Sequence, residues 1–350
     1  MKHTRLGAGF TAALLTTALA GCGSGAAAED SKALTFVMWG GSIQEANMES
    51  YVQPWAEKEG VRVLQDSPTD YAKLRAQVES GKPSWGVVQV EPNFAVQACK
   101  EGLLEKIDTS VVDTSVVDPE MVSECAVPNI IEDFTIGYNT DVFTGDHPTD
   151  WAEFFDTKEF PGKRGFWKYV TGGIFEAALL ADGVAPADLY PLDIDRAFAK
   201  LDTIKDDLLF YDTGDQQVQL LASGEAPLVQ AWNGRLTVAA AEGQPVANEW
   251  GAHLHAYEQF VIPKGYANAD LAQEFLGHFV KDVEGQAVWA ERTGFSPVNP
   301  GALEHVSAET ARGISISPEI VSKSAATVDY TYWEEHYDEV TERFNEWLAS

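Results

Sequence analysis

The sequence predicts an α/β protein built from two α/β lobes, and three observations lead to this fold class. Short apolar runs alternate with longer segments whose apolar residues have helical spacing, which indicates strands alternating with helices. The alternation occurs twice along the chain, so each half is expected to form βαβ units around a parallel sheet. The chain has 350 residues, and those that follow a predicted leader are enough for roughly two domains.

The elements of the first half follow from their apolar patterns. Residues 34–39 form a short apolar run that reads as a buried strand, and residues 43–59 carry apolar side chains at helical spacing. The next expected elements are strands at 61–64 and 87–90 and helices at 71–80 and 93–102.

The second half repeats this character. We expect strands at 165–167, 227–232 and 261–263, and helices at 174–181, 197–204, 216–222 and 236–242. The strand at 261–263 is expected to return the chain to the first lobe. A final amphipathic helix at 332–348 has an apolar face at helical spacing and is interpreted as structural.

Residues 1–21 have the layout of a lipoprotein signal peptide. A basic start precedes an apolar run that is too short to span a membrane, and the run ends in Leu19-Ala20-Gly21-Cys22. This ending resembles a bacterial lipobox, in which the cysteine carries lipid and becomes the mature N-terminus. We therefore expect an extracytoplasmic protein, anchored to the cell membrane by Cys22, with residues 22–32 as a flexible tether. A plain secretory signal with a coincidental cysteine is the alternative.

The net charge limits the possible partners. Formal charge is −30, and it becomes −32 once the signal leaves with Lys2 and Arg5. Nucleic acid is excluded as a partner class, because phosphate binding needs clustered lysine and arginine. A cationic ligand fits this charge, although solubility is the favoured explanation for most of it.

Two cysteines remain once Cys22 carries lipid. Cys99 and Cys125 are separated by 26 positions and lie in a compartment that is expected to be oxidising, where an even pair usually forms a disulfide. A reduced, buried pair is the alternative. Neither cysteine lies near a histidine in the sequence, so nothing marks a nucleophile.

Motifs for catalysis, cofactors and metals are absent from the sequence. It contains no Gly-x-Ser-x-Gly, His-Glu-x-x-His, Walker-type or Gly-x-Gly-x-x-Gly motif, so no enzyme activity, cofactor or metal is predicted. His253 and His255 could offer two ligands on one strand face, but no third ligand accompanies them, and surface histidines are the preferred interpretation. The many acids leave open a secreted hydrolase that uses paired carboxylates.

Polar and aromatic residues follow several predicted strands, where ligands of open α/β sheets bind. Aromatic faces beside a few carboxylates suit an organic ammonium. Core packing is the alternative for each tryptophan. The candidate binding residues at these strand ends are Trp39 and Ser42, Glu91 and Asn93, and Trp232 and Arg235.

Several short stretches, in their order and spacing, resemble the spermidine/putrescine-binding family of ABC importer solute-binding proteins. They are residues 135–143, 224–234, 260–263 and 294–299. The resemblance covers roughly residues 34–347. It implies the type II periplasmic-binding-protein fold, with an interlobe cleft, crossover hinge strands and closure on ligand. It also implies ABC permease subunits as partners and an amine or amino-acid ligand, and we expect a monomer.

The two-lobe plan divides the mature chain into four segments. We expect residues 33–137 and 259–307 in lobe 1, and residues 138–258 and 308–350 in lobe 2.

The resemblance also implies roles for individual residues. Trp39 and Trp232 stand where family members place aromatics that clamp the ligand. Glu258 holds the place of a carboxylate that binds an amine, and Phe295 occupies a wall position that is often tyrosine. Glu91 and Asn93 belong to the loop on the first lobe's side of the cleft.

Two departures from the polyamine binders change the expected ligand. Residues 170–173 carry no carboxylate where polyamine binders have two acids, and Arg235 stands where they have serine. An arginine repels a diamine but pairs with a carboxylate. A γ-aminobutyrate-binding branch of the family is similar at this position. The sequence therefore favours a zwitterion such as γ-aminobutyrate, with its ammonium at Glu258 and its carboxylate at Arg235. Polyamine binding, with Arg235 turned outward into a salt bridge, is the alternative.

Overall fold

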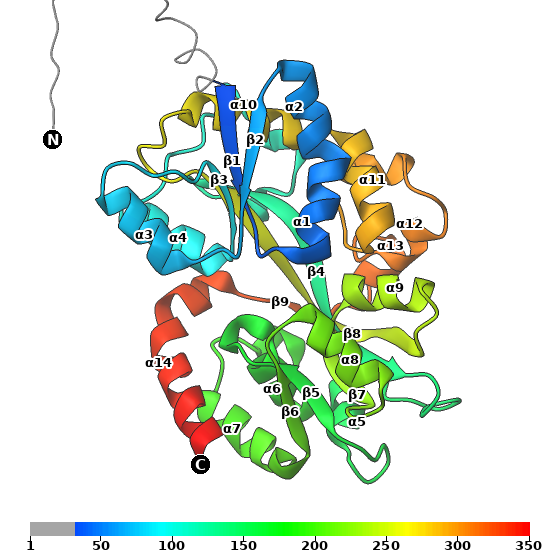
Figure 1. Cartoon of the computed structure of the whole chain (residues 1–350). Coiled ribbons are helices and arrows are strands. Elements are labelled where there is room, and N and C mark those ends of the chain that lie inside the picture. The colour runs from blue at the N-terminus through cyan, green and yellow to red at the C-terminus, as the bar shows by residue number, and fades with distance from the viewer. Residues whose placement is uncertain (1–31) are drawn as a thin grey trace, which may run out of the picture.

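A computed structural model describes residues 32–350 of the chain (Figure 1). The predicted signal peptide, the lipidation site Cys22 and the tether up to residue 31 lie outside the described residues. Strands and helices alternate through both halves of the chain, so the predicted α/β class is confirmed. They form two bodies, one above the other in Figure 1, which share a single sheet.

The sheet has nine strands and runs through both lobes. Its order is β2-β1-β3-β8-β4-β7-β5-β6, with β9 paired to β8. Strands β1, β2 and β3 are parallel in one lobe, and β5, β6 and β7 are parallel in the other. The carboxyl ends of parallel strands meet at one edge, so each lobe has one edge suited to ligands.

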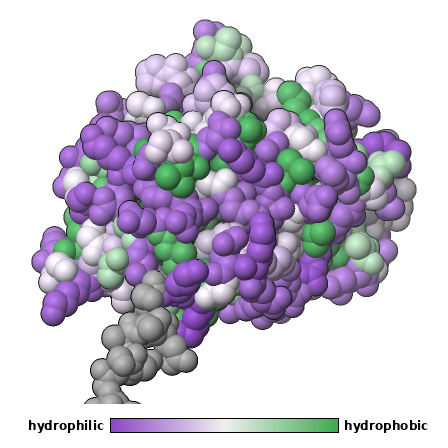
Figure 2. All heavy atoms as spheres, turned by 90° about the horizontal axis from the view of Figure 1, so that it is seen from above, coloured by the Kyte–Doolittle hydropathy of each residue, from purple (hydrophilic) through white to green (hydrophobic). Residues whose placement is uncertain are grey.

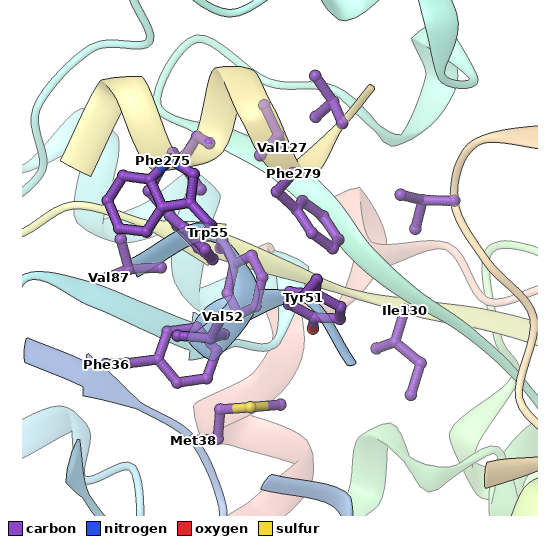
Figure 3. Packing of buried hydrophobic residues seen from close by; sticks show 14 of the residues in the cluster. Phe36, Met38, Tyr51, Val52, Trp55, Val87, Val127, Ile130, Phe275 and Phe279 are labelled. Atoms are coloured by element: carbon purple, nitrogen blue, oxygen red, sulfur yellow. The ribbon is translucent and has the colours of Figure 1, made fainter. Parts of the chain in front are cut away.

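The upper body, lobe 1, packs helices around its three parallel strands. Phe36, Trp55 and Phe275 meet in its core, where the Trp55 and Phe275 rings lie 5.1 Å apart (Figure 3). Its strands are β1 (Ala33–Val37), β2 (Arg62–Asp66) and β3 (Val87–Val90). Its helices are α1 (Gly41–Asn47), η2 (Met48–Val52), α2 (Gln53–Glu59), α3 (Tyr71–Glu79), α4 (Pro92–Lys100), η3 (Thr114–Val116), η4 (Pro119–Met121), α10 (Ala269–Phe279), α11 (Val283–Thr293) and η8 (Pro300–Glu304).

The lower body, lobe 2, has its own aromatic core around Phe175, Trp333 and Phe344. Its strands are β5 (Arg164–Trp167), β6 (Leu208–Tyr211) and β7 (Leu228–Trp232). Its helices are α5 (Trp151–Phe155), η5 (Val170–Gly172), α6 (Ile174–Ala181), η6 (Pro186–Asp188), α7 (Ile194–Asp202), η7 (Lys205–Asp207), α8 (Gly214–Ala222), α9 (Asn233–Ala241) and α14 (Tyr330–Ala349). The predicted amphipathic helix at the C-terminus is α14, and its apolar face packs into this core.

Two long antiparallel strands connect the lobes. They are β4 (Ala126–Asn139) and β8 (Val246–Val261), which pair with each other along most of their length and run between the two bodies (Figure 1). Their register shifts between Pro128 and Ile130 and again between Phe134 and Ile136, and such irregularities bend a strand pair. A third connection passes through α12 (Thr310–Gly313), α13 (Pro318–Val321) and β9 (Ala326–Thr327).

The main differences from the expected elements concern length and connection. The helix expected at 43–59 is present as α1, η2 and α2, with one wide turn in the middle. The strand expected at 261–263 overlaps the sixteen-residue β8 only at Val261, where β8 ends, so its expected extent was wrong. Strand β4 and helices α10 and α11 were not among the expected elements.

Cys99 and Cys125 form the predicted disulfide, with Cα atoms 5.8 Å apart. The bond joins the end of α4 to the residue before β4. In the chain-entropy account, closing a loop of this length stabilises the fold by about 3–4 kcal/mol.

The face of lobe 1 that is seen from above in Figure 2 is mostly hydrophilic. Apolar residues on that face are scattered among polar ones. Among residues 32–350, no helix combines the length and the apolar character needed to cross a membrane.

Candidate functional site

The candidate site lies where the carboxyl ends of the parallel strands of both lobes approach the hinge strands. Trp39 and Glu91 follow β1 and β3 in lobe 1, and Trp232 ends β7 in lobe 2. Glu258 lies on the hinge strand β8. We call these residues, together with Glu132 and Arg235, the interlobe site.

Trp39 and Glu258 form a pair that joins lobe 1 to the hinge. The Trp39 indole Nε1 donates to both carboxylate oxygens of Glu258, at 3.0 and 3.1 Å. Glycine at position 40, with φ of 91°, lets the chain turn from β1 into α1 while the indole remains 42% exposed. Burial raises the pKa of the Glu258 carboxyl well above its usual range, and the charges of Glu132 and Glu91 raise it further.

Glu91 connects the two lobes. The Thr171 hydroxyl, on η5 of lobe 2, donates to Glu91 Oε1 at 2.7 Å, and the Tyr71 hydroxyl donates to Oε2 at 3.3 Å. Burial raises the pKa of the Glu91 carboxyl, while these two hydrogen bonds oppose the rise. Asn93 lies two residues further on, and its buried side-chain oxygen has no hydrogen-bond partner in the described part of the chain.

Arg235 projects from the first turn of α9 toward lobe 1. Its Nη1 donates to the hydroxyl of Ser42, on α1, at 3.3 Å, and lies 3.7 Å from the exposed carboxylate of Asp215. Gly214 leaves room for the guanidinium, because a Cβ at that position would lie 2.6 Å from Nε. The side chain is 23% exposed, and burial lowers its pKa. Arg235 therefore has both the lobe-internal ion pair of the alternative interpretation and a contact across the lobes.

Trp232 lies among the aromatic side chains of lobe 2. Its ring is 4.8 Å from Trp167, 5.8 Å from Tyr211 and 6.3 Å from Phe134. These rings come from the ends of β5 and β6 and from the hinge strand β4. They fix the orientation of the indole and form an aromatic wall on the lobe 2 side of the interlobe site.

Phe295 is held behind α9. It is 3% exposed, stacks on Trp289 with ring centroids 6.2 Å apart, and leaves no room for a side chain at Gly234. Direct contact of Phe295 with a ligand stays a prediction. In this structure it supports the helix that carries Arg235.

Sequence reasoning missed Glu132. This residue lies on β4 and is 9% exposed, and the neighbouring side chain of Trp232 lowers the pKa of its carboxyl. Burial raises the pKa of its carboxyl to about 8, helped by the charges of Glu91 and Asp133 and opposed by Arg235. The signal available in the sequence was the pair Glu132-Asp133 inside an otherwise mostly apolar run.

The interpretation of His253 and His255 as surface residues was wrong for His253. Its side chain is 1% exposed, and its Nε2 lies 3.5 Å from Asp133 Oδ1. His255 is partly buried, with Nδ1 3.0 Å from the same oxygen. Burial lowers the pKa of His255, but the hydrogen bond and charge of Asp133 outweigh this effect and raise it overall. Both histidines sit beside a buried carboxylate in the hinge.

The fold and the site define a class of protein. Two α/β lobes, joined by strands that cross between them and carrying polar and aromatic residues where they meet, form a two-lobed solute-binding protein. A family model described as "Bacterial extracellular solute-binding protein" matches residues 51–314. The chain belongs to this family, and it is a solute-binding protein of the kind that serves ABC importers.

Individual proteins of known ligand and a solved structure are similar to this chain. A gamma-aminobutyric acid-binding protein of Pseudomonas aeruginosa is 34% identical over 331 residues, which cover 93% of each chain. A solved structure of a GABA receptor is 42% identical, with a TM-score of 0.85, and the match covers 91% of this chain and 98% of that one. The spermidine/putrescine-binding periplasmic protein 1 of Haemophilus influenzae is 25% identical over 216 residues, 59% of each chain. The resemblance to this family seen in the sequence is confirmed.

Proposed function

We propose that the protein captures a small ω-amino acid such as γ-aminobutyrate between its lobes and delivers it to an ABC permease. The observation that carries this proposal is the pair of opposite charges in the interlobe site. Glu258 is partly exposed beside the indole of Trp39, and Arg235 reaches across the lobes to Ser42. A zwitterion places an ammonium at the first group and a carboxylate at the second.

Charge pairing explains why both ends of the ligand are recognised. An ammonium or carboxylate that leaves water without a partner costs several kcal/mol, so a closed site must supply an opposite charge at each end. Arg235 supplies the cation, and its guanidinium geometry suits a carboxylate. The two relatives that bind γ-aminobutyrate support the same ligand class for this chain.

Polyamine binding is the second candidate. Three acids, Glu91, Glu132 and Glu258, meet at the interlobe site, and such an excess of carboxylates suits a polycation. Against this, the Glu91 oxygens both accept hydroxyl hydrogen bonds, and Arg235 would repel an amine. The zwitterion therefore accounts for the arrangement better.

The remaining features of this proposal come from the sequence. The mature protein acts as a monomer without chemistry of its own, held at the outer face of the membrane or in the periplasm by lipid on Cys22. Residues 33–137 with 259–307, and residues 138–258 with 308–350, are the two lobes in this proposal, and β4 and β8 join them. Ligand closes them about β4 and β8, the two strands that cross between the cores.

A ligand panel tests this function on the mature domain without its lipid. We expect γ-aminobutyrate to raise the melting temperature, because a ligand that binds only the folded state stabilises it by mass action. Putrescine and spermidine should give smaller shifts, and X-ray scattering should show a smaller radius of gyration at saturation. The ligand should be recovered unchanged by NMR. A larger shift with putrescine would favour the polyamine function, and consumption of the ligand would indicate a hydrolase.

A further inference from the structure

Two tryptophan–glutamate pairs meet on the hinge, one from each lobe. Trp39 of lobe 1 donates its indole N–H to Glu258 on β8. Trp232 of lobe 2 lies beside Glu132 on β4, and its side chain lowers the pKa of that carboxyl. An indole N–H is only a donor, so each tryptophan favours the ionised form of the carboxylate beside it.

The strand register places the two carboxylates on one face. Glu132 is directly opposite Ala256, and Glu258 is directly opposite Ile130, so the two glutamates are diagonal neighbours on adjacent antiparallel strands. Such neighbours have Cα atoms about 7–8 Å apart, within reach of long side chains. Their charges interact, since Glu132 raises the pKa of Glu258.

From this juxtaposition we propose that Glu132 and Glu258 together hold the ammonium of the ligand, and that the ammonium displaces a proton from this pair when it enters. The inference rests on the proposed function and adds a second recognition residue to it. Two carboxylates beside two indole rings form a suitable binding site for an organic ammonium, through charge-assisted hydrogen bonds and cation–π contacts.

The proton balance follows from the charges around the pair. Without ligand, two neighbouring carboxylates, one buried and one partly buried, do not both ionise readily, so one proton is retained between them at neutral pH. The ligand brings a positive charge, which favours the ionised form of both glutamates, and the retained proton passes to the solvent. No other bond changes. The affinity should therefore rise with pH over the range in which the unliganded pair retains this proton.

Other charged and titratable groups that face Glu132 and Glu258 do not change the expected direction of the pH dependence, in which affinity rises with pH. The tyrosines among them have pKa values raised above their usual range and stay neutral, Arg235 stays positive, and the Glu91 carboxylate is held by two hydroxyls. The groups are Glu91 before α4, Asp133 on β4, Arg235 on α9, Tyr71 on α3, Tyr211 on β6 and Tyr330 on α14.

Calorimetry in two buffers measures the displaced proton. The mature domain is titrated with γ-aminobutyrate at pH 7 in phosphate and in Tris, whose ionisation enthalpies differ, so the difference in heat gives the protons released. We expect release of about one proton per ligand for the wild type. Glu132→Gln should lose at least half of this release and weaken binding about 10- to 100-fold.

Glu176→Gln is the matched control. Glu176 is also buried with a raised carboxyl pKa, but it accepts hydrogen bonds from Tyr190 and Trp333 inside lobe 2. This variant should release as many protons as the wild type. Identical heats in the two buffers for the wild type would overturn the proposal whether or not Glu132→Gln folds. Failure of the wild type to bind γ-aminobutyrate at all would instead refute the proposed function.

Discussion

Replacing Arg235 with alanine is expected to weaken binding of γ-aminobutyrate by about 2–5 kcal/mol, the usual loss for one half of a desolvated ion pair. In the wild type the guanidinium is largely buried and contacts Ser42 of the other lobe. In the variant, closure of the lobes would therefore bury the carboxylate of the ligand without a cationic partner. Putrescine, which has no carboxylate, should bind the variant as well as or better than the wild type, because a like charge has been removed.

The control for this comparison is Arg312→Ala. Arg312 lies exposed on α12, so its loss changes net charge equally without touching the interlobe site. Titration calorimetry of both variants with both ligands separates the effects. If Arg235→Ala retained full affinity for γ-aminobutyrate, Arg235 would serve only its contacts with Ser42 and Asp215, and polyamine binding would become the better account.

Replacing Glu258 with glutamine is expected to weaken γ-aminobutyrate and putrescine alike, by about 2–5 kcal/mol each. Both ligands present an ammonium, and glutamine keeps the shape of the side chain while removing its charge. The exposed Glu225 offers a matched Glu225→Gln control. Loss of affinity for one ligand alone would contradict a shared ammonium position.

The melting temperature of Glu258→Gln shows whether weaker binding by this variant is caused by unfolding. Because burial raises the pKa of the Glu258 carboxyl, the folded state binds its proton more tightly than the unfolded chain does. Ionisation of this group therefore destabilises the unliganded protein progressively as pH rises above the unfolded pKa of about 4.3. Glutamine has no such cost. Unliganded Glu258→Gln should melt at the same or a higher temperature than the wild type at pH 8, so weaker binding would not reflect unfolding.

The sequence predicted best those site residues that directly follow a strand, because their position depends only on neighbouring residues in the chain. Trp39, Glu91 and Trp232 follow strands whose apolar runs could be recognised, and parallel strands bring such ends to one edge of the sheet. The same reasoning identified Arg235, because it lies in the first turn of the helix that follows β7. Local sequence patterns predict which residues lie at the strand ends, but they do not predict which of these residues contact a ligand.

Glu132 shows why the rest could not be predicted. Its partners come from β8 and from the end of β7, about one hundred or more positions later in the chain, and only the register of β4 against β8 brings Glu258 close. Strand β4 itself was missed because it is buried along nearly its whole length, so it lacks the alternation of polar and apolar residues that marks a half-exposed strand. His253 was misjudged for the same reason, since its partner Asp133 lies on that strand.

Titration of the mature wild-type domain with four related ligands tests recognition of both ends most directly. γ-Aminobutyrate carries both charges, butylamine only the ammonium, butyrate only the carboxylate, and putrescine an ammonium at each end. The opposite charges of Arg235 and Glu258 predict that γ-aminobutyrate binds at least about 30-fold more tightly than each of the other three, since each unpaired end costs about 2 kcal/mol or more. Equal affinity for butylamine or putrescine would contradict recognition of a zwitterion between the two lobes.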